Sequence, residues 1–169
     1  SAPICACMMR AAFFTATAWV QIPHSAMSEE VLTYHFEVDG VNFTSAGEAS
    51  VQTKKILRRI GFDTDVIRRV AVAMYEGEIN MVIHAGGGVA DVMVYPDRIV
   101  IVLTDHGPGI ADIDLAMQEG FSTAPENIRS LGFGAGMGLP NMKRYSDEMQ
   151  IDSTLGVGTK ITMTVCING

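Results

Sequence analysis

The stretch GFGAGMGLP, from Gly132 to Pro140, has a glycine at every second position as far as Gly138. Alternating glycines remove the side chains from one length of backbone, so its N–H groups can approach an anion closely. Pro140 suits the first turn of a helix, where its missing N–H costs nothing. A glycine-rich loop that leads into a helix N-terminus favours phosphate binding. Plain flexible connections share this composition, so the interpretation depends on the motifs that accompany it.

The composition is that of one globular, acidic domain. The 169 residues are 48% hydrophobic and 18% charged, which indicates a chain with one substantial core. The net charge of −7 argues against nucleic acid or an anionic membrane as the main partner. It does not exclude nucleotides, because a local group of backbone N–H donors can hold phosphates within an acidic protein.

The first residues of the chain differ from the rest. The apolar run from Ala11 to Val20 is too short to span a bilayer, and Met27 begins a stretch typical of a natural start. We therefore expect an N-terminal extension over residues 1–26 and a single domain over residues 27–169. Cys5, Cys7 and Cys166 are an odd number of cysteines and predict no disulfide framework, which favours a reducing, cytoplasmic location.

Hydrophobic periodicity and turn residues predict an α+β fold. We expect a two-layer sandwich, with a mixed, mostly antiparallel sheet and its helices on one face. The segment Thr44 to Glu48 carries a capping signal for the first helix, and Asp63 is expected to cap the second. Exposed strand edges near residues 30–40 make a homodimer possible. The expected strands are 32–38, 89–95, 98–104 (central), 149–153 and 159–167; the expected helices are 44–60, 63–85, 111–118 and 139–146, with a mobile loop over 119–131.

Glu76 and Asn80 stand four residues apart on the long apolar helix, hence on one face of it. A buried carboxylate and amide need partners, and a hydrogen-bonded pair or a solvent-facing stripe would satisfy them. In a second interpretation Asn80 supplies an oxygen to Mg²⁺, which prefers few protein ligands beside phosphate oxygens and water. Glu76 would then accept a proton from an attacking hydroxyl or water.

The segment Asp105-His-Gly107-Pro-Gly109 directly follows the expected central strand. A carboxylate at a strand end can accept a hydrogen bond from the exocyclic amine of adenine. Guanine presents a carbonyl at that position, so such a contact would select ATP over GTP. In isolation, an ordinary turn in which Asp105 caps backbone N–H groups explains the segment equally well. Thr159 offers a hydroxyl at the start of the last strand.

Taken in order, these motifs resemble the ATP-binding fold shared by gyrase, the heat-shock chaperone, histidine kinases and MutL. Glu76-x-x-x-Asn80 is similar to the N box of that superfamily, and Asp105-x-Gly107-x-Gly109 to its first glycine box. Gly132 to Leu139 is similar to the second glycine box, and Gly156-Val-Gly158-Thr159 to the closing Gly-Thr element. The resemblance covers residues 30 to 167.

Within the superfamily the chain resembles the anti-sigma-factor serine/threonine kinases, including the stressosome switch kinase. The stretches Asp112 to Gln118 and Gly120 to Thr123 carry this resemblance. It implies that ATP phosphorylates a serine or threonine of a small antagonist-type partner with a sulphate-transporter/anti-sigma-antagonist domain. It further implies Glu76 as the base, Asn80 as the Mg²⁺ ligand, and a lid that closes over the phosphates. The nucleotide-binding residues that it implies are Asn80, Asp105, Gly107, Gly109, Gly132, Phe133, Gly134, Gly136, Met137, Gly138, Leu139 and Thr159, with Asp105 contacting adenine through water shared with Thr159.

Two alternatives remain open at this point. The same motifs fit a nucleotide-dependent binding module that sequesters a sigma factor or a downstream signalling enzyme with little or no phosphotransfer. A detached histidine-kinase domain is less consistent, because it would need a helical hairpin with a phosphoacceptor histidine. The sequence also leaves open whether His84 and His106 touch the ligand.

Overall fold

The computed structural model describes residues 31–41, 45–130 and 133–167. The expected extension over 1–26 lies outside these residues, as do Thr44 and Gly132. Among the described residues no helix combines the length and the apolar character that crossing a membrane requires.

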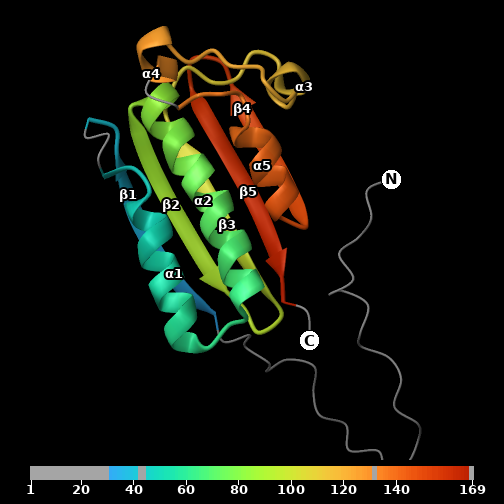
Figure 1. The fold of residues 1–169 in the computed structure, drawn as a ribbon. Coiled ribbons are helices and arrows are strands. Elements are labelled where there is room, and N and C mark those ends of the chain that lie inside the picture. The colour runs from blue at the N-terminus through green and yellow to red at the C-terminus, as the bar shows by residue number, and fades with distance from the viewer. Residues whose placement is uncertain (1–30, 42–44, 131–132, 168–169) are drawn as a thin grey trace, which may run out of the picture.

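The core of the fold is one five-stranded sheet in the order β1-β2-β3-β5-β4, as Figure 1 shows. Every pairing in it is antiparallel, so the predicted α+β class is confirmed and the sheet is antiparallel throughout rather than mixed. β3 is the central strand, as its run of valine and isoleucine predicted. The strands are β1 (Leu32–Asp39), β2 (Gly87–Val94), β3 (Arg98–Asp105), β4 (Glu148–Thr154) and β5 (Gly158–Cys166).

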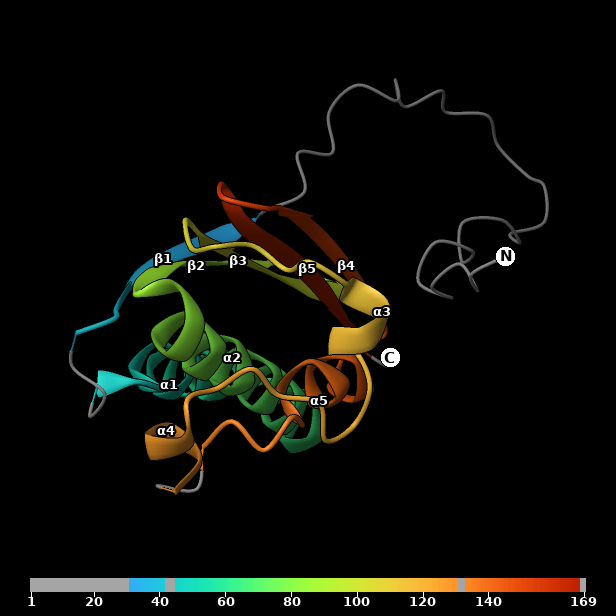
Figure 2. The ribbon, with the colours of Figure 1, turned by 90° about the horizontal axis from the view of Figure 1, so that it is seen from above.

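Three helices pack on one face of this sheet, and Figure 2 shows the two layers from above. They are α1 (Glu48–Ile60), α2 (Thr64–Ala85) and α5 (Gly138–Tyr145), with the short α3 (Ile113–Ala116) and α4 (Glu126–Ser130) in the long connection between β3 and α5. Asp63 caps α2 as predicted, accepting a hydrogen bond from the Asp65 N–H at 2.8 Å. The segment 119–131, predicted to be a mobile loop, contains the short helix α4 within its described part.

Most boundaries differ from the sequence prediction by one residue, and two of the larger differences lie in β2 and α3. β2 begins at Gly87 rather than at Val89, because Gly87 and Gly88 pair with Asp39 and Val38 of β1. The helix expected over 111–118 shortens to a single turn, Ile113–Ala116, capped by Asp112.

Cys166 is disulfide-bonded, contrary to the expectation of no disulfide framework, and it is the one cysteine within the described residues.

Helix α2 packs against the central strand at Gly77. A Cβ on Gly77 would stand 2.0 Å from Cδ1 of Leu103, so a larger residue at position 77 would force the buried Leu103 side chain to move. On either side of Gly77 the helix buries apolar side chains against the sheet, among them Met74 and Met81. Removal of this surface from water is the main stabilising contribution to the domain.

The N-terminus of α1 is capped by a residue distant in sequence. Gly47 is the N-cap and provides no side-chain hydrogen bond, and Thr44 of the expected capping signal lies outside the described residues. Instead the Glu78 carboxylate of α2 accepts three backbone N–H groups: Oε2 from Gly47 at 3.0 Å and Ala49 at 3.1 Å, and Oε1 from Ser50 at 2.7 Å. Glu78 is 1% exposed, and this burial raises the pKa of its carboxyl, an effect that the three N–H donors oppose.

Replacement of Glu78 by Gln should lower the free energy of unfolding by about 2 kcal/mol. The amide oxygen can accept from Gly47 and Ala49, but the NH₂ group would then face the N–H of Ser50 and leave that donor unpaired. Urea denaturation measures the loss. Glu37→Gln, at an exposed position of β1, is the matched control and should change stability by less than about 0.5 kcal/mol. Equal unfolding free energies for the two variants would contradict the capping role.

Candidate functional site

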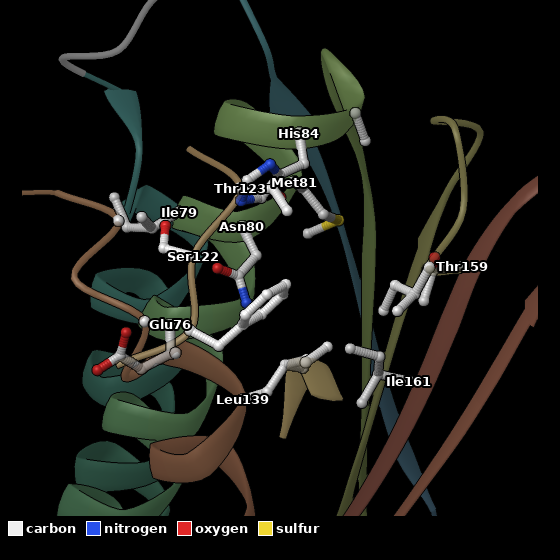
Figure 3. Close-up of a pocket in the computed structure, with 18 of the residues that line it drawn as sticks. Glu76, Ile79, Asn80, Met81, His84, Ser122, Thr123, Leu139, Thr159 and Ile161 are labelled. Carbon is white, nitrogen blue, oxygen red and sulfur yellow. The ribbon is translucent and has the colours of Figure 1, made fainter. Parts of the chain in front are cut away.

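A cavity of about 590 Å³ opens between α2 and the sheet and is bounded by the connection from β3 to α5. Figure 3 shows its two walls, with Glu76, Asn80 and His84 on the α2 side and Thr159 and Ile161 on the sheet side. Its volume is in the range of sites for nucleotide-sized ligands. Much of the lining is apolar, with Ile79, Leu103 and Phe121 among the residues that form it.

The structure brings together almost all of the predicted site residues. Eleven of them line the cavity: Glu76, Asn80, Asp105, Gly109, Phe133, Gly134, Gly136, Met137, Gly138, Leu139 and Thr159. Gly107 does not line it, and Gly132 lies outside the described residues. A Cβ on Gly107 would stand 2.6 Å from the Cβ of Ala85, so this glycine serves the packing of the turn against the end of α2.

The two oxygen atoms of Asp105 are compatible with the two interpretations of the sequence, a turn cap and a ligand contact. Its Oδ1 accepts hydrogen bonds from the N–H groups of Gly107 at 2.8 Å and Thr159 at 3.2 Å. No hydrogen bond to Oδ2 occurs among the described residues, so that oxygen remains available at the cavity wall. Beside it, the hydroxyl of Thr159 pairs with that of Ser153 at 2.8 Å. The inner oxygen therefore fixes the turn, and the outer one is left for a ligand donor.

Glu76 and Asn80 lie on one face of α2, but they do not bond to each other. Oε1 of Glu76 accepts a hydrogen bond from Nδ2 of Asn141 at 2.7 Å. Nδ2 of Asn80 lies 3.9 Å from Sδ of Met142, and its Oδ1 has no hydrogen-bond partner among the described residues. Figure 3 shows Asn80 pointing into the cavity, whereas Glu76 turns its carboxylate away from the wall formed by Thr159 and Ile161. Both side chains are thus held by α5 and not by one another.

The alternating glycines perform different tasks. Gly134 and Gly136 have φ values of 69° and 75°, in the left-handed region that favours glycine. The carbonyl of Gly136 accepts the N–H of Gly120 at 3.0 Å, which ties the glycine loop to the segment before α4. Gly138 begins α5 and passes close to Asn80, where a Cβ would stand 2.9 Å from both amide atoms. Met137, the N-cap of α5, makes no capping side-chain bond, so the first N–H groups of this helix remain available for an anion.

Several lining residues were not predicted from the sequence as site residues. Ser122 and Thr123 contribute hydroxyls from the segment before α4, within a stretch that carried the family resemblance but no assigned role. His84 also lines the cavity, and desolvation there lowers the pKa of its imidazole, with the charge of Asp105 acting in the opposite direction. His106 is exposed and is not part of the lining. Arg144 pairs with Glu119 at 2.9 Å on the surface.

The donors available for a metal ion are few. In the described part of the chain no group of three or more histidine, cysteine or acidic side chains is placed to hold a metal. The cavity does contain one amide oxygen, Oδ1 of Asn80, with no protein partner in that part of the chain. A single oxygen donor fits Mg²⁺, which takes its remaining ligands from phosphate and water.

Comparison with known proteins gives the cavity a context. Residues 42–165 match the family described as "Histidine kinase-like ATPase domain". The serine/threonine-protein kinase RsbT of Bacillus subtilis is 35% identical over 112 residues, which are 64% of this chain and 78% of that protein. An anti-sigma F factor of Caldanaerobacter subterraneus is 34% identical over 103 residues, which are 58% of this chain and 68% of that protein.

A solved structure shares the fold. The crystal structure of the RsbU and RsbW domains of a Mycobacterium tuberculosis protein superposes with a TM-score of 0.54 at 18% identity. The match covers 79% of this chain and 32% of that one, so the chain spans about a third of the solved protein. At this identity the likeness concerns the fold alone.

Replacement of Gly138 by Ala should weaken ATP binding about tenfold with little loss of stability. The added Cβ would stand 2.9 Å from both amide atoms of Asn80 and displace that side chain within the cavity. Isothermal titration calorimetry with ATP and Mg²⁺ measures the effect. Pro140→Ala, in the same turn but outside the cavity lining, is the control. Unchanged affinity in Gly138→Ala would show that the position of Asn80 does not matter for ATP.

Proposed function

We propose that this chain is an ATP-dependent protein serine/threonine kinase of a bacterial partner-switching pathway of the anti-sigma or stressosome type. The chain belongs to the histidine kinase-like ATPase domain family. The observation that carries this proposal is the convergence of Glu76, Asn80, Asp105 and the glycine loop on one cavity. Relatives named as a serine/threonine kinase and as anti-sigma F factors support it.

In this proposal ATP lies along the cavity with its purine at the sheet side. Oδ2 of Asp105 accepts a hydrogen bond from the exocyclic amine of adenine, and the Thr159 hydroxyl contacts adenine through a water that it shares with Asp105. The phosphates lie beneath the glycine loop, where the uncapped N-terminus of α5 supplies N–H donors and a favourable dipole. The segment with Ser122 and Thr123 acts as the lid over the phosphates.

The acceptor hydroxyl approaches from the rim, near Glu76. As the hydroxyl oxygen of a serine or threonine bonds to the γ-phosphorus, its proton passes to the Glu76 carboxylate and the bond to the β-phosphate oxygen breaks, which releases ADP. Oδ1 of Asn80 would hold Mg²⁺, which when bound neutralises charge on the phosphate oxygens. The lid excludes water, so transfer goes to the protein hydroxyl.

The substrate in this proposal is a small antagonist-type protein with a sulphate-transporter/anti-sigma-antagonist domain. A second protein partner is a sigma factor or a downstream signalling enzyme. These proteins meet in the cytoplasm, where the proposal places the chain. β1 is an edge strand of the sheet, and pairing through it would give a homodimer.

The decisive experiment is phosphotransfer from labelled ATP to a small antagonist-type protein with a sulphate-transporter/anti-sigma-antagonist domain. Replacement of Glu76 by Gln should lower the transfer rate by a factor of about 100 or more, because the amide cannot accept the hydroxyl proton. ATP affinity should stay within about threefold of the wild type. A wild-type chain that binds ATP and the partner but transfers no phosphate would favour the alternative, a nucleotide-dependent regulatory binding module.

Replacement of Asp105 by Asn tests the position of the purine. The amide oxygen can keep the hydrogen bonds from Gly107 and Thr159, while NH₂ takes the place of Oδ2 and turns an acceptor into a donor. ATP affinity should fall about ten- to a hundredfold and the preference for ATP over GTP should shrink or reverse. Calorimetric titrations with both nucleotides measure this. The purine lies elsewhere if the variant binds ATP and GTP as the wild type does.

A further inference from the structure

Asn141 forms the shortest side-chain bond between the site and its surroundings, and no motif in the sequence pointed to it. Its Nδ2 donates to Oε1 of Glu76 at 2.7 Å, and both residues are half-buried. A donor to a carboxylate at this distance makes a charge-assisted hydrogen bond, about twice as strong as a bond between neutral groups. Among the described residues, Oε1 has no other partner and Oε2 has none.

The bond is one of several contacts between the first turns of α5 and the face of α2 that carries Glu76 and Asn80. Gly138 passes against the amide of Asn80, and Met142 places its sulfur 3.9 Å from Nδ2 of the same residue. Asn141 lies between these two positions in sequence and reaches Glu76. Helix α5 therefore touches both Glu76 and Asn80.

We infer that Asn141 is a positioning residue for phosphotransfer: it holds Oε1 of Glu76 so that Oε2 faces the acceptor hydroxyl. The inference rests on the proposed function and adds to it the group that orients the base. A free glutamate side chain samples several rotamers, and only some of them place an oxygen within hydrogen-bond reach of a hydroxyl at the rim. A fixed donor on one oxygen removes most of that freedom before the substrate arrives.

This arrangement also links the base to the nucleotide. Asn141 stands in the first turn of α5, directly after the loop that would hold the phosphates. A displacement of that loop moves the donor with it, so Glu76 is oriented when the glycine loop has the arrangement seen in the structure. Chemistry on the acceptor hydroxyl then depends on an ordered phosphate site.

The test is a double-mutant cycle with Asn141→Leu and Glu76→Gln, measured as labelled phosphate transferred from ATP to the antagonist-type protein. Leucine has nearly the shape of asparagine but no donor. In the wild-type background we expect kcat to fall about ten- to a hundredfold, while the KM for ATP and the calorimetric affinity for a non-hydrolysable ATP analogue stay within about threefold. In the Glu76→Gln background the same substitution should leave the residual rate unchanged.

Asn127→Leu is the matched control, since Asn127 is exposed on α4 and does not line the cavity. It should keep the wild-type kcat. The inference is overturned if Asn141→Leu leaves kcat unchanged, or if it lowers the rate equally in both backgrounds, since a merely structural role acts whether or not the base is present. A wild-type chain that transfers no phosphate overturns the proposed function itself and is recognised before any variant is compared.

Discussion

The close approach of α2 to β3 at Gly77 is the constraint on which the rest of the structure depends. A Cβ at residue 77 would stand 2.0 Å from Cδ1 of the buried Leu103, so any larger residue at this position would displace a core side chain of β3. The residues on either side of Gly77 are glutamates, and they point in different directions around the helix. Glu78 reaches the start of α1, and Glu76 reaches α5. One buried helix thereby fixes the two neighbouring helices by polar contacts as well as by its apolar surface.

The two glutamates show what a sequence can and cannot reveal. The spacing of Glu76 and Asn80 sufficed to predict that both lie on one helix face, and both line the cavity. Nothing local distinguishes Glu78, because its three donors lie 28 to 31 residues earlier in the chain. The capping signal from Thr44 to Glu48 is a local pattern, whereas the contact from Glu78 to the start of α1 is a tertiary one. Asn141 escaped prediction for the same reason, since its partner is 65 residues away.

The elements of the fold were predictable where periodicity and turn residues agree. Asp63 and Gly86 define the ends of α2, and the valine-rich run of β3 marks the centre of the sheet. The prediction failed where pairing decides the outcome: Gly87 and Gly88 look like a helix stop, yet they join β2 because Val38 and Asp39 lie opposite them. Gly107 belongs to a motif that predicts ligand contact, but its lack of a side chain serves the packing against Ala85.

The kinase and the binding module differ less in structure than their names suggest. In both proposals Asp105, the glycine loop and the N-terminus of α5 would bind the nucleotide, and Glu76 would be the residue that separates phosphate transfer from nucleotide binding alone. The lid segment is tied to the glycine loop through Gly120 and Gly136, and α5 continues from that loop to the Asn141 contact with Glu76. In the proposed function, a change at the phosphates would therefore reach both the lid segment and the Glu76 carboxylate through these contacts. An ATP-binding domain of this design can couple the state of its nucleotide to the protein that it holds, whether or not it transfers phosphate to that protein.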